Sequence, residues 1–144
     1  IMEVRPFIKE HGYLIFNNIN NQLLGVQTDL SFIDDLEVDY CFTGVKNKEP
    51  IVCGGVIKYW QGCYEGWVIA SSKINNYPFE VARTIKKYTD ILIKEKEIHR
   101  LQTAVLHNFE DGHRFAKFLG MKPEGLMEKY DYMQQDYVRY ARVA

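Results

Sequence analysis

The feature that most constrains this chain is the direct succession of a strand, a polar loop, a long helix and another strand. Residues 65–70 favour a strand, and residues 71–77 are polar and show no period. Pro78 suits the first position of a helix, because its missing N–H would have no partner there. Apolar residues recur at helical spacing over residues 79–97, and residues 101–106 are again strand-like. This succession predicts two parallel neighbouring strands joined by a crossover helix.

The remaining segments predict further strands and shorter helices around this unit. They are a strand at 3–6, a helix at 7–19, a short helix at 23–36, strands at 38–45 and 51–60, a helix capped by Asn108 and ended by Gly120, and strands at 125–130 and 137–143. Asparagines at 17, 18, 20 and 21 indicate a break after the first helix. We therefore expect an α/β (α+β) fold, with a mixed central sheet and about four helices, in one domain over residues 2–144.

Composition and charge argue against several classes of protein. The formal net charge is −1, so the basic excess of a general nucleic-acid-binding protein is missing. No run approaches the roughly 18 apolar residues of a membrane helix, and the first residues lack the apolar core of a signal peptide. The 3 cysteines have no paired spacing, which favours a reducing cytoplasm, and the 4 histidines lie in no zinc-binding motif.

Five short motifs in the second half of the chain indicate a family. They are EGW at 65–67, YPFEVARTIKKY at 77–88, HRLQ at 99–102, LGMKPEG at 119–125 and DYVRYARV at 136–143. These motifs and the element order resemble the GNAT superfamily of acyl-CoA N-acyltransferases. They are most similar to the GNAT-like proteins of short-tailed bacteriophages. The resemblance implies that the two parallel strands splay apart, beyond Val68 in the first and Val105 in the second.

The resemblance also implies an acyl-CoA site in the gap between these strands. In the family, the pyrophosphate meets the N-terminus of the crossover helix, where free N–H groups and the helix dipole favour phosphate. On this sequence the strand backbone at Val68, Ile69 and Ala70 would contact and polarise the acyl group. The other expected acetyl-CoA contacts are Lys73, Phe79, Arg83 and Asn108.

The sequence departs from the family pattern at the phosphate loop and at the general acid. The family's phosphate loop carries glycines, whereas residues 73–79 contain none, Pro78 removes a donor, and Glu80 adds a negative charge. Lys73 and Arg83 could supply charge–phosphate contacts in place of the missing donors. Many members place a tyrosine where this chain has Ala116, and His113 is the candidate to replace that acid.

Glu65 is the candidate general base, because GNAT enzymes often hold a glutamate near the start of this strand. Strand spacing leaves open whether its side chain enters the cleft or lies in solvent, since a slip of one residue reverses the face. Two functions therefore remain. The first is an N-acyltransferase in which an amine attacks the thioester of acetyl-CoA directly while Glu65 takes the proton. The second is a non-catalytic phage protein that acts in virion assembly or binds a host protein.

Both functions place the protein in the cytoplasm of an infected bacterial host. Its partners would be acyl-CoA and an amine in the first case, and a phage or host protein in the second. We expect no nucleic acid, membrane or metal among its ligands, and the sequence leaves a homodimer open.

Overall fold

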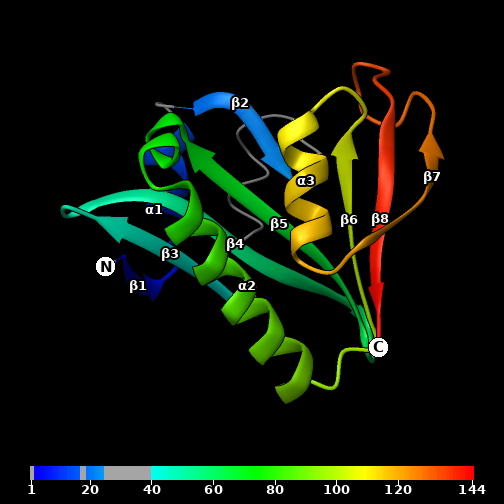
Figure 1. Cartoon of the computed structure of the whole chain (residues 1–144), viewed down its shortest axis with the longest axis horizontal. Coiled ribbons are helices and arrows are strands. Elements are labelled where there is room, and N and C mark those ends of the chain that lie inside the picture. The colour runs from blue at the N-terminus through cyan, green and yellow to red at the C-terminus, as the bar shows by residue number, and fades with distance from the viewer. Residues whose placement is uncertain (1, 17–18, 25–39) are drawn as a thin grey trace.

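The computed structural model describes residues 2–16, 19–24 and 40–144. Figure 1 shows a twisted sheet with helices on both faces. The elements in chain order are β1 (Glu3–Pro6), α1 (Lys9–Phe16), β2 (Ile19–Leu24), β3 (Tyr40–Lys46), β4 (Glu49–Trp60), β5 (Cys63–Ser71), the 3-10 helix η2 (Ser72–Asn76), α2 (Pro78–Glu95), β6 (Arg100–Leu106), α3 (Glu110–Phe118), β7 (Lys122–Met127) and β8 (Tyr137–Val143).

The sheet is mixed, as the sequence predicts. Its strands lie in the order β1-β3-β4-β5-β6-β8-β7, and β2 pairs with β5 off this path. The described pairs are antiparallel except β5 with β6, which are parallel. The crossover helix α2 joins these parallel strands, so the predicted strand–helix–strand unit and the α/β fold class are confirmed.

Alternation along β5 divides the core between the two faces of the sheet. Tyr64 and Ala70 belong to the larger core cluster, which α2 and α3 cover. Trp67 and Ile69 belong to a smaller cluster with residues of α1 and the segment before it. Phe7 meets the Trp67 ring edge-on, with the ring centroids 5.3 Å apart. Successive residues of β5 therefore face opposite sides of the molecule.

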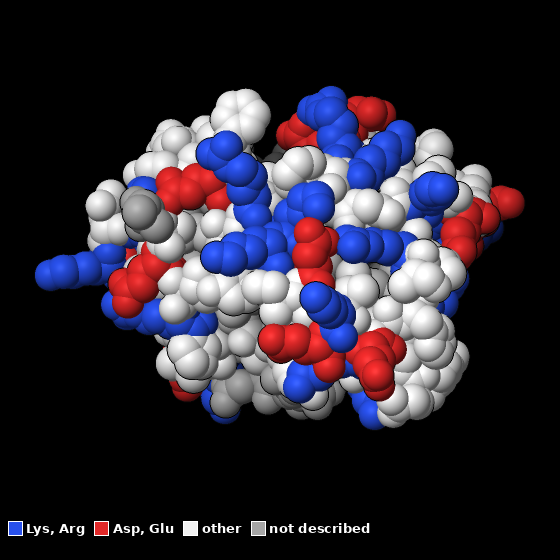
Figure 2. All heavy atoms as spheres, turned by 60° about the horizontal axis from the view of Figure 1, so that its bottom comes forward, with Lys and Arg blue, Asp and Glu red and all other residues white. Residues whose placement is uncertain are grey.

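Helix α2 is fixed by its apolar stripe and by charged contacts. Pro78 occupies its first turn, and Val81 and Ile85 are buried against the sheet. Asp90 accepts from Lys86 at 2.9 Å and from Arg142 of β8 at 2.7 Å, so α2 is also fastened to a strand that follows it by many residues. Figure 2 shows the face of the molecule that lies at the bottom of Figure 1, near the C-terminal end of α2. Basic and acidic side chains are interspersed on this face.

The structure corrects several expected boundaries. The helix expected at 7–19 is shorter, at Lys9–Phe16, and Asn20 and Asn21 lie in β2 rather than in a break. Leu23 and Leu24 also belong to β2, and residues 25–36 of the expected short helix lie outside the described residues. Asparagine is a poor strand former, but pairing with β5 outweighs that local preference.

The second half of the chain differs in smaller ways. The polar segment after β5 is the 3-10 helix η2 rather than an irregular loop. Helix α3 is capped by Phe109 without a side-chain hydrogen bond, so the expectation that Asn108 caps it is wrong. Gly120 follows the helix with a φ of 92°, which confirms it as the stop. The strand expected at 125–130 begins and ends earlier, as β7.

Candidate functional site

The fork between β5 and β6 lies at the centre of the candidate site. These strands pair at Cys63↔Arg100, Tyr64↔Leu101 and Glu65↔Gln102, and then diverge. Just past the last pair, the Thr103 hydroxyl donates to the Gly66 carbonyl at 2.9 Å. The predicted splay is therefore present, but it begins at Glu65 and Gln102 rather than beyond Val68 and Val105.

Strand β2 enters this fork. It pairs antiparallel with β5 at Leu24↔Val68, Leu23↔Ile69 and Ile19↔Ser71, immediately beyond the point where β6 departs. It also lies against β6 and α3. Figure 1 shows β2 crossing between β5 and α3. The sequence pattern does not predict this strand, because its asparagines indicate a break.

An apolar cavity of about 280 Å³ lies beside the fork, on the face covered by α2 and α3. Val68 and Ala70 of β5 form its floor, and residues of η2, α2 and α3 form its walls. Asn75 and Asp111 are polar members of a lining that is otherwise mostly apolar. The cavity therefore suits an apolar group more than a charged one.

Gly112 allows α3 to approach this wall closely. A Cβ at position 112 would lie 2.5 Å from Phe109 Cδ2 and 2.8 Å from Val105 Cγ1. Any larger residue would push the helix away from β6. The close packing of α3 at Gly112 thus sets the width of the cavity on the α3 side.

In η2 and at the start of α2, several backbone donors are already engaged. The Lys73 N–H donates to Ser71 Oγ at 3.2 Å, and the Tyr77 N–H donates to the Ile74 carbonyl at 2.9 Å. Pro78 has no N–H, and the Val81 N–H donates to the Tyr77 carbonyl at 3.0 Å. Fewer donors are therefore available here to an anion than at a glycine-rich loop.

The charged side chains around this helix start form ion pairs. Lys73 Nζ lies 2.5 Å from Glu49 Oε1, and both side chains are nearly half exposed. Lys46 of β3 donates to both Glu80 oxygens, at 3.0 and 3.1 Å. These hydrogen bonds lower the pKa of Glu80, so its carboxylate is ionised at neutral pH.

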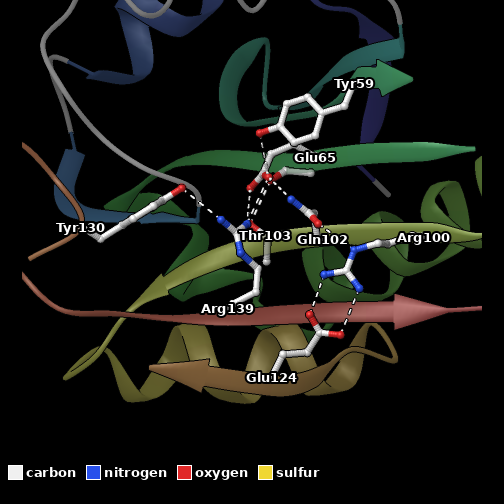
Figure 3. A network of polar contacts seen from close by, with 9 residues as sticks. Tyr59, Glu65, Arg100, Gln102, Thr103, Glu124, Tyr130 and Arg139 are labelled. Atoms are coloured by element: carbon white, nitrogen blue, oxygen red, sulfur yellow. Dashed lines mark hydrogen bonds and ion pairs between the residues drawn. The ribbon is translucent and has the colours of Figure 1, made fainter. Parts of the chain in front are cut away.

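Glu65 lies on the opposite face of the sheet from the cavity, together with Trp67 and Ile69. Figure 3 shows its carboxylate at the centre of a polar network. Arg139 of β8 donates to both of its oxygens, at 3.2 and 3.3 Å. The Tyr59 hydroxyl donates at 3.1 Å and Gln102 Nε2 at 3.2 Å.

The ion pair at the centre of this network is largely shielded from solvent, whereas Tyr59 and Tyr130 at its margin are exposed. The side chain of Glu65 is 14% exposed and that of Arg139 is 17% exposed. Burial, and next the Glu65 charge, raise the pKa of Tyr59 to about 12, so its hydroxyl stays a donor. Arg139 also donates to the Tyr130 hydroxyl at 3.0 Å. Several donors therefore engage both oxygens of the Glu65 side chain.

The position at which many GNAT enzymes carry the general acid is Ala116 in this chain, and it lies in the buried core. Ala116 is 0% exposed and belongs to the larger core cluster. His113 Nε2 lies 2.7 Å from the His107 carbonyl, to which it must donate, and Nδ1 lies 2.8 Å from the Tyr140 hydroxyl. His113 thus packs on β8 and does not line the cavity.

The structure separates the site residues expected from the sequence. Val68 and Ala70 line the cavity, whereas Ile69 faces α1 and Glu65 lies in the polar network. The other expected acetyl-CoA contacts lie outside the cavity lining: Lys73, Phe79, Arg83 and Asn108. Phe79 is 77% exposed. Sequence reasoning missed Tyr59 and Arg139, because nothing in the motif at 136–143 indicates a partner for its first arginine.

Within the described ranges, no helix is long and apolar enough to span a membrane. In the same part of the chain, no group of His, Cys, Asp and Glu side chains is arranged to hold a metal ion.

Comparison with known proteins identifies the fold. No protein-family model matches the chain, and no curated protein matches its sequence significantly. Solved structures do match over its full length. The ribosomal-protein-S18-alanine N-acetyltransferase from Escherichia coli superposes with a TM-score of 0.78 at 10% identity, covering 99% of this chain and 94% of that one.

Two further acetyltransferases give the same result. A GNAT-family acetyltransferase from Bacillus anthracis has a TM-score of 0.73 at 16% identity, covering 99% of this chain and 94% of that one. The IAA acetyltransferase from Bacillus cereus has a TM-score of 0.77 at 8% identity, covering 100% of both chains. With its forked parallel strands, crossover helix and closing hairpin, this chain has the fold of the GNAT acetyltransferases.

Proposed function

We propose that the chain is an N-acyltransferase that moves an acyl group from acyl-CoA, with acetyl-CoA as the first candidate, to an amine. The observation that carries this proposal is the apolar cavity beside the fork of β5 and β6. Its volume of about 280 Å³ is just below the roughly 300–1,000 Å³ typical of ligand pockets. That volume suits the acyl group and part of the extended arm behind it, rather than the whole of acyl-CoA.

The residues present fit acyl-CoA unevenly. The apolar floor at Val68 and Ala70 suits the acyl end. The β5 backbone would offer groups that polarise a carbonyl only where β2 does not pair with it. The start of α2 offers few backbone donors, so the phosphates would depend on side-chain charge. Lys73 and Arg83 are the cations that we propose for this role, and Lys73 would have to leave Glu49.

The proposed reaction needs no covalent intermediate with the protein. The amine nitrogen attacks the thioester carbonyl carbon, a C–N bond forms, and the C–S bond breaks to release the CoA thiolate, which solvent protonates. Glu65 is the proposed acceptor of the amine proton. Because Glu65 lies on the opposite face of the sheet from the cavity, the thioester would have to lie in the fork between β5 and β6, and the amine would approach it from the Glu65 face. Because Arg139, Tyr59 and Gln102 already donate to its oxygens, an incoming ammonium would have to displace one of these donors.

A second candidate function is favoured by the same contacts. A GNAT fold that is retained without catalysis would show three features of this chain. They are the Glu65–Arg139 ion pair, the engaged backbone donors before α2 and the buried Ala116. In that case the chain would serve a bacteriophage in virion assembly or bind a protein of the infected host. The comparisons concern the fold alone and do not distinguish these functions.

Titration calorimetry with acetyl-CoA separates the two. Micromolar binding, followed by acyl transfer to one member of an amine panel, would support the acyltransferase. Absence of binding at millimolar acetyl-CoA would favour the non-catalytic function. Desulfo-CoA serves as a control, because it should bind through the same arm but cannot carry an acyl group.

A further inference from the structure

Both edges of β5 are occupied beyond the fork. On one side, β4 pairs with β5 along its length, including Gly54↔Val68, Cys53↔Ile69 and Val52↔Ala70. On the other side, β6 stops pairing at Gln102, and β2 takes over from Val68 to Ser71. Among the described residues, this part of β5 therefore keeps no open edge. A free edge would be needed by any extended ligand that pairs with the strand backbone.

Strand β2 is poorly suited to its place. Its sequence is INNQLL, and asparagine is depleted in strands. Its register with β5 shifts between Ile19 and Leu23, so the pairing is interrupted over the polar residues in between. By contrast, β4 holds the other edge of β5 through an unbroken register from Val52 to Lys58. A short, irregular, asparagine-rich strand opens more readily than the rest of its sheet.

The arm of acyl-CoA is an extended chain that carries amide groups. To lie along β5 with its thioester at the fork, it requires the same backbone groups that β2 engages. β2 also lies against β6 and α3, so it occupies the space between the diverging strands as well as the edge. The arm and β2 cannot occupy the fork together.

We propose that β2 is an autoinhibitory strand, which occupies the fork until it is displaced and so makes acyl-CoA binding depend on its release. This proposal rests on the acyl-CoA function proposed above and concerns the regulation of that site. The apparent affinity then equals the intrinsic affinity reduced by the fraction of molecules in which β2 is out of the fork. Release by a partner would convert the protein from a closed state to a binding-competent state.

A reversible cross-link between β2 and β5 tests the proposal. Leu24 and Val68 are directly opposed in the register, so the Leu24→Cys, Val68→Cys variant places two thiols within reach of a disulfide. Because Val68 lines the cavity, the comparison is made between the oxidised and reduced forms of this one variant. Native Cys53 and Cys63 are buried and Cys41 is partly buried, and mass spectrometry of peptides identifies which thiols have joined.

The matched control is a disulfide between β7 and β8, which lie away from the fork. Leu126 and Val138 are opposed in the β7–β8 pair, so Leu126→Cys, Val138→Cys gives a comparable disulfide at the edge of the sheet. Its oxidation should leave acetyl-CoA binding unchanged. A second variant, Leu23→Pro, removes a backbone donor from β2 and weakens its pairing without any cross-link.

Calorimetry with acetyl-CoA gives three distinguishable outcomes. The proposal is supported if oxidation of the β2–β5 variant weakens binding by about tenfold or more, reduction restores it, and Leu23→Pro binds more tightly than the wild type. Equal binding by the oxidised and reduced forms overturns the autoinhibitory role and leaves the acyltransferase standing. No binding by any form, including Leu23→Pro, overturns both, because there would be no acyl-CoA site for β2 to close.

Discussion

Glu65 of β5 and Arg139 of β8 form an ion pair that spans the intervening strand β6, with Arg139 Nη1 3.2 Å from Glu65 Oε1. The contact sits at the last register pair before β5 and β6 diverge. The ion pair therefore holds β5 and β8 together across β6 at the point where β5 and β6 diverge. The same carboxylate is the proposed base, so its structural and chemical roles compete.

The first prediction concerns stability. Arg139→Met should lower the free energy of unfolding by roughly 1–3 kcal/mol, because it leaves the shielded Glu65 carboxylate without its cation. Glu65→Gln should cost less, since glutamine still accepts from Tyr59. Urea unfolding of both variants and of the double variant gives the coupling between the two side chains. A coupling near zero would show that the pair does not hold the fork together.

The second prediction concerns turnover. If the chain transfers acetyl groups, Glu65→Gln should lower kcat by about 10²–10⁴-fold, because glutamine keeps the shape but cannot take a proton. Acetyl-CoA binding, measured by calorimetry, should be unchanged, since Glu65 lies across the sheet from the cavity. Turnover that survives the substitution would assign Glu65 to the structural network alone.

The third prediction concerns the phosphates. Arg83→Ala should weaken acetyl-CoA binding and reduce its dependence on salt, because several backbone donors in η2 and at the start of α2 are already engaged and Pro78 has no N–H. Lys94→Ala, on the same helix but in its last turn, is the control and should change neither quantity. Identical binding curves for Arg83→Ala and the wild type would place the phosphates elsewhere.

The fourth prediction concerns Ala116. Although a tyrosine there would match the family's usual acid, the site is 0% exposed and enclosed by core side chains. Ala116→Tyr should therefore destabilise the protein by about 1–3 kcal/mol through overpacking. Ala116→Ser, which adds a single oxygen, serves as the small-volume comparison in thermal unfolding. A tyrosine variant as stable as the wild type would mean that α3 can move outward from β6.

The fifth prediction concerns acid stability. Lys46 lowers the pKa of Glu80 below its ordinary value of 4.5, so this carboxylate stabilises the fold above that value and loses its contribution as pH falls through the folded-state pKa. Glu80→Gln should therefore flatten the pH dependence of unfolding on the acid side of about 4.5. Chemical unfolding from pH 3 to pH 7 measures this slope. An unchanged slope would assign the acid sensitivity to other carboxylates.

Sequence reasoning succeeded where local pattern and tertiary structure agree. The apolar spacing after Pro78 predicted α2, and the succession of strand, helix and strand predicted the parallel pairing of β5 with β6. It failed at β2, where asparagines indicate a break but the backbone of β5 offers an edge to pair with. Intrinsic preference could not reveal that edge, because it exists only after β6 has diverged.

The candidate site was predicted less completely than the fold. Val68 and Ala70 line the cavity as expected, since strand alternation carries every second residue to one face. The partners of Glu65 were missed, because Tyr59 and Arg139 reach it from other strands and their meeting depends on the order of strands in the sheet. Contacts between residues so far apart in the chain cannot be predicted from the residue spacing of a single sequence.

The parallel pairing of β5 with β6 also has a consequence for how the chain folds. Strands β3, β4 and β5 are joined by tight turns, so their contacts are local and form quickly. Strand β6 can pair with β5 only after the chain has continued through α2. During synthesis, the meander and β2 emerge from the ribosome before β6 does. For that interval the edge of β5 at Cys63–Glu65 lacks its partner, whereas β2 can already cover the part of the same edge from Val68 to Ser71. The strand that closes the fork in the finished protein would thus protect the growing one from edge-to-edge aggregation.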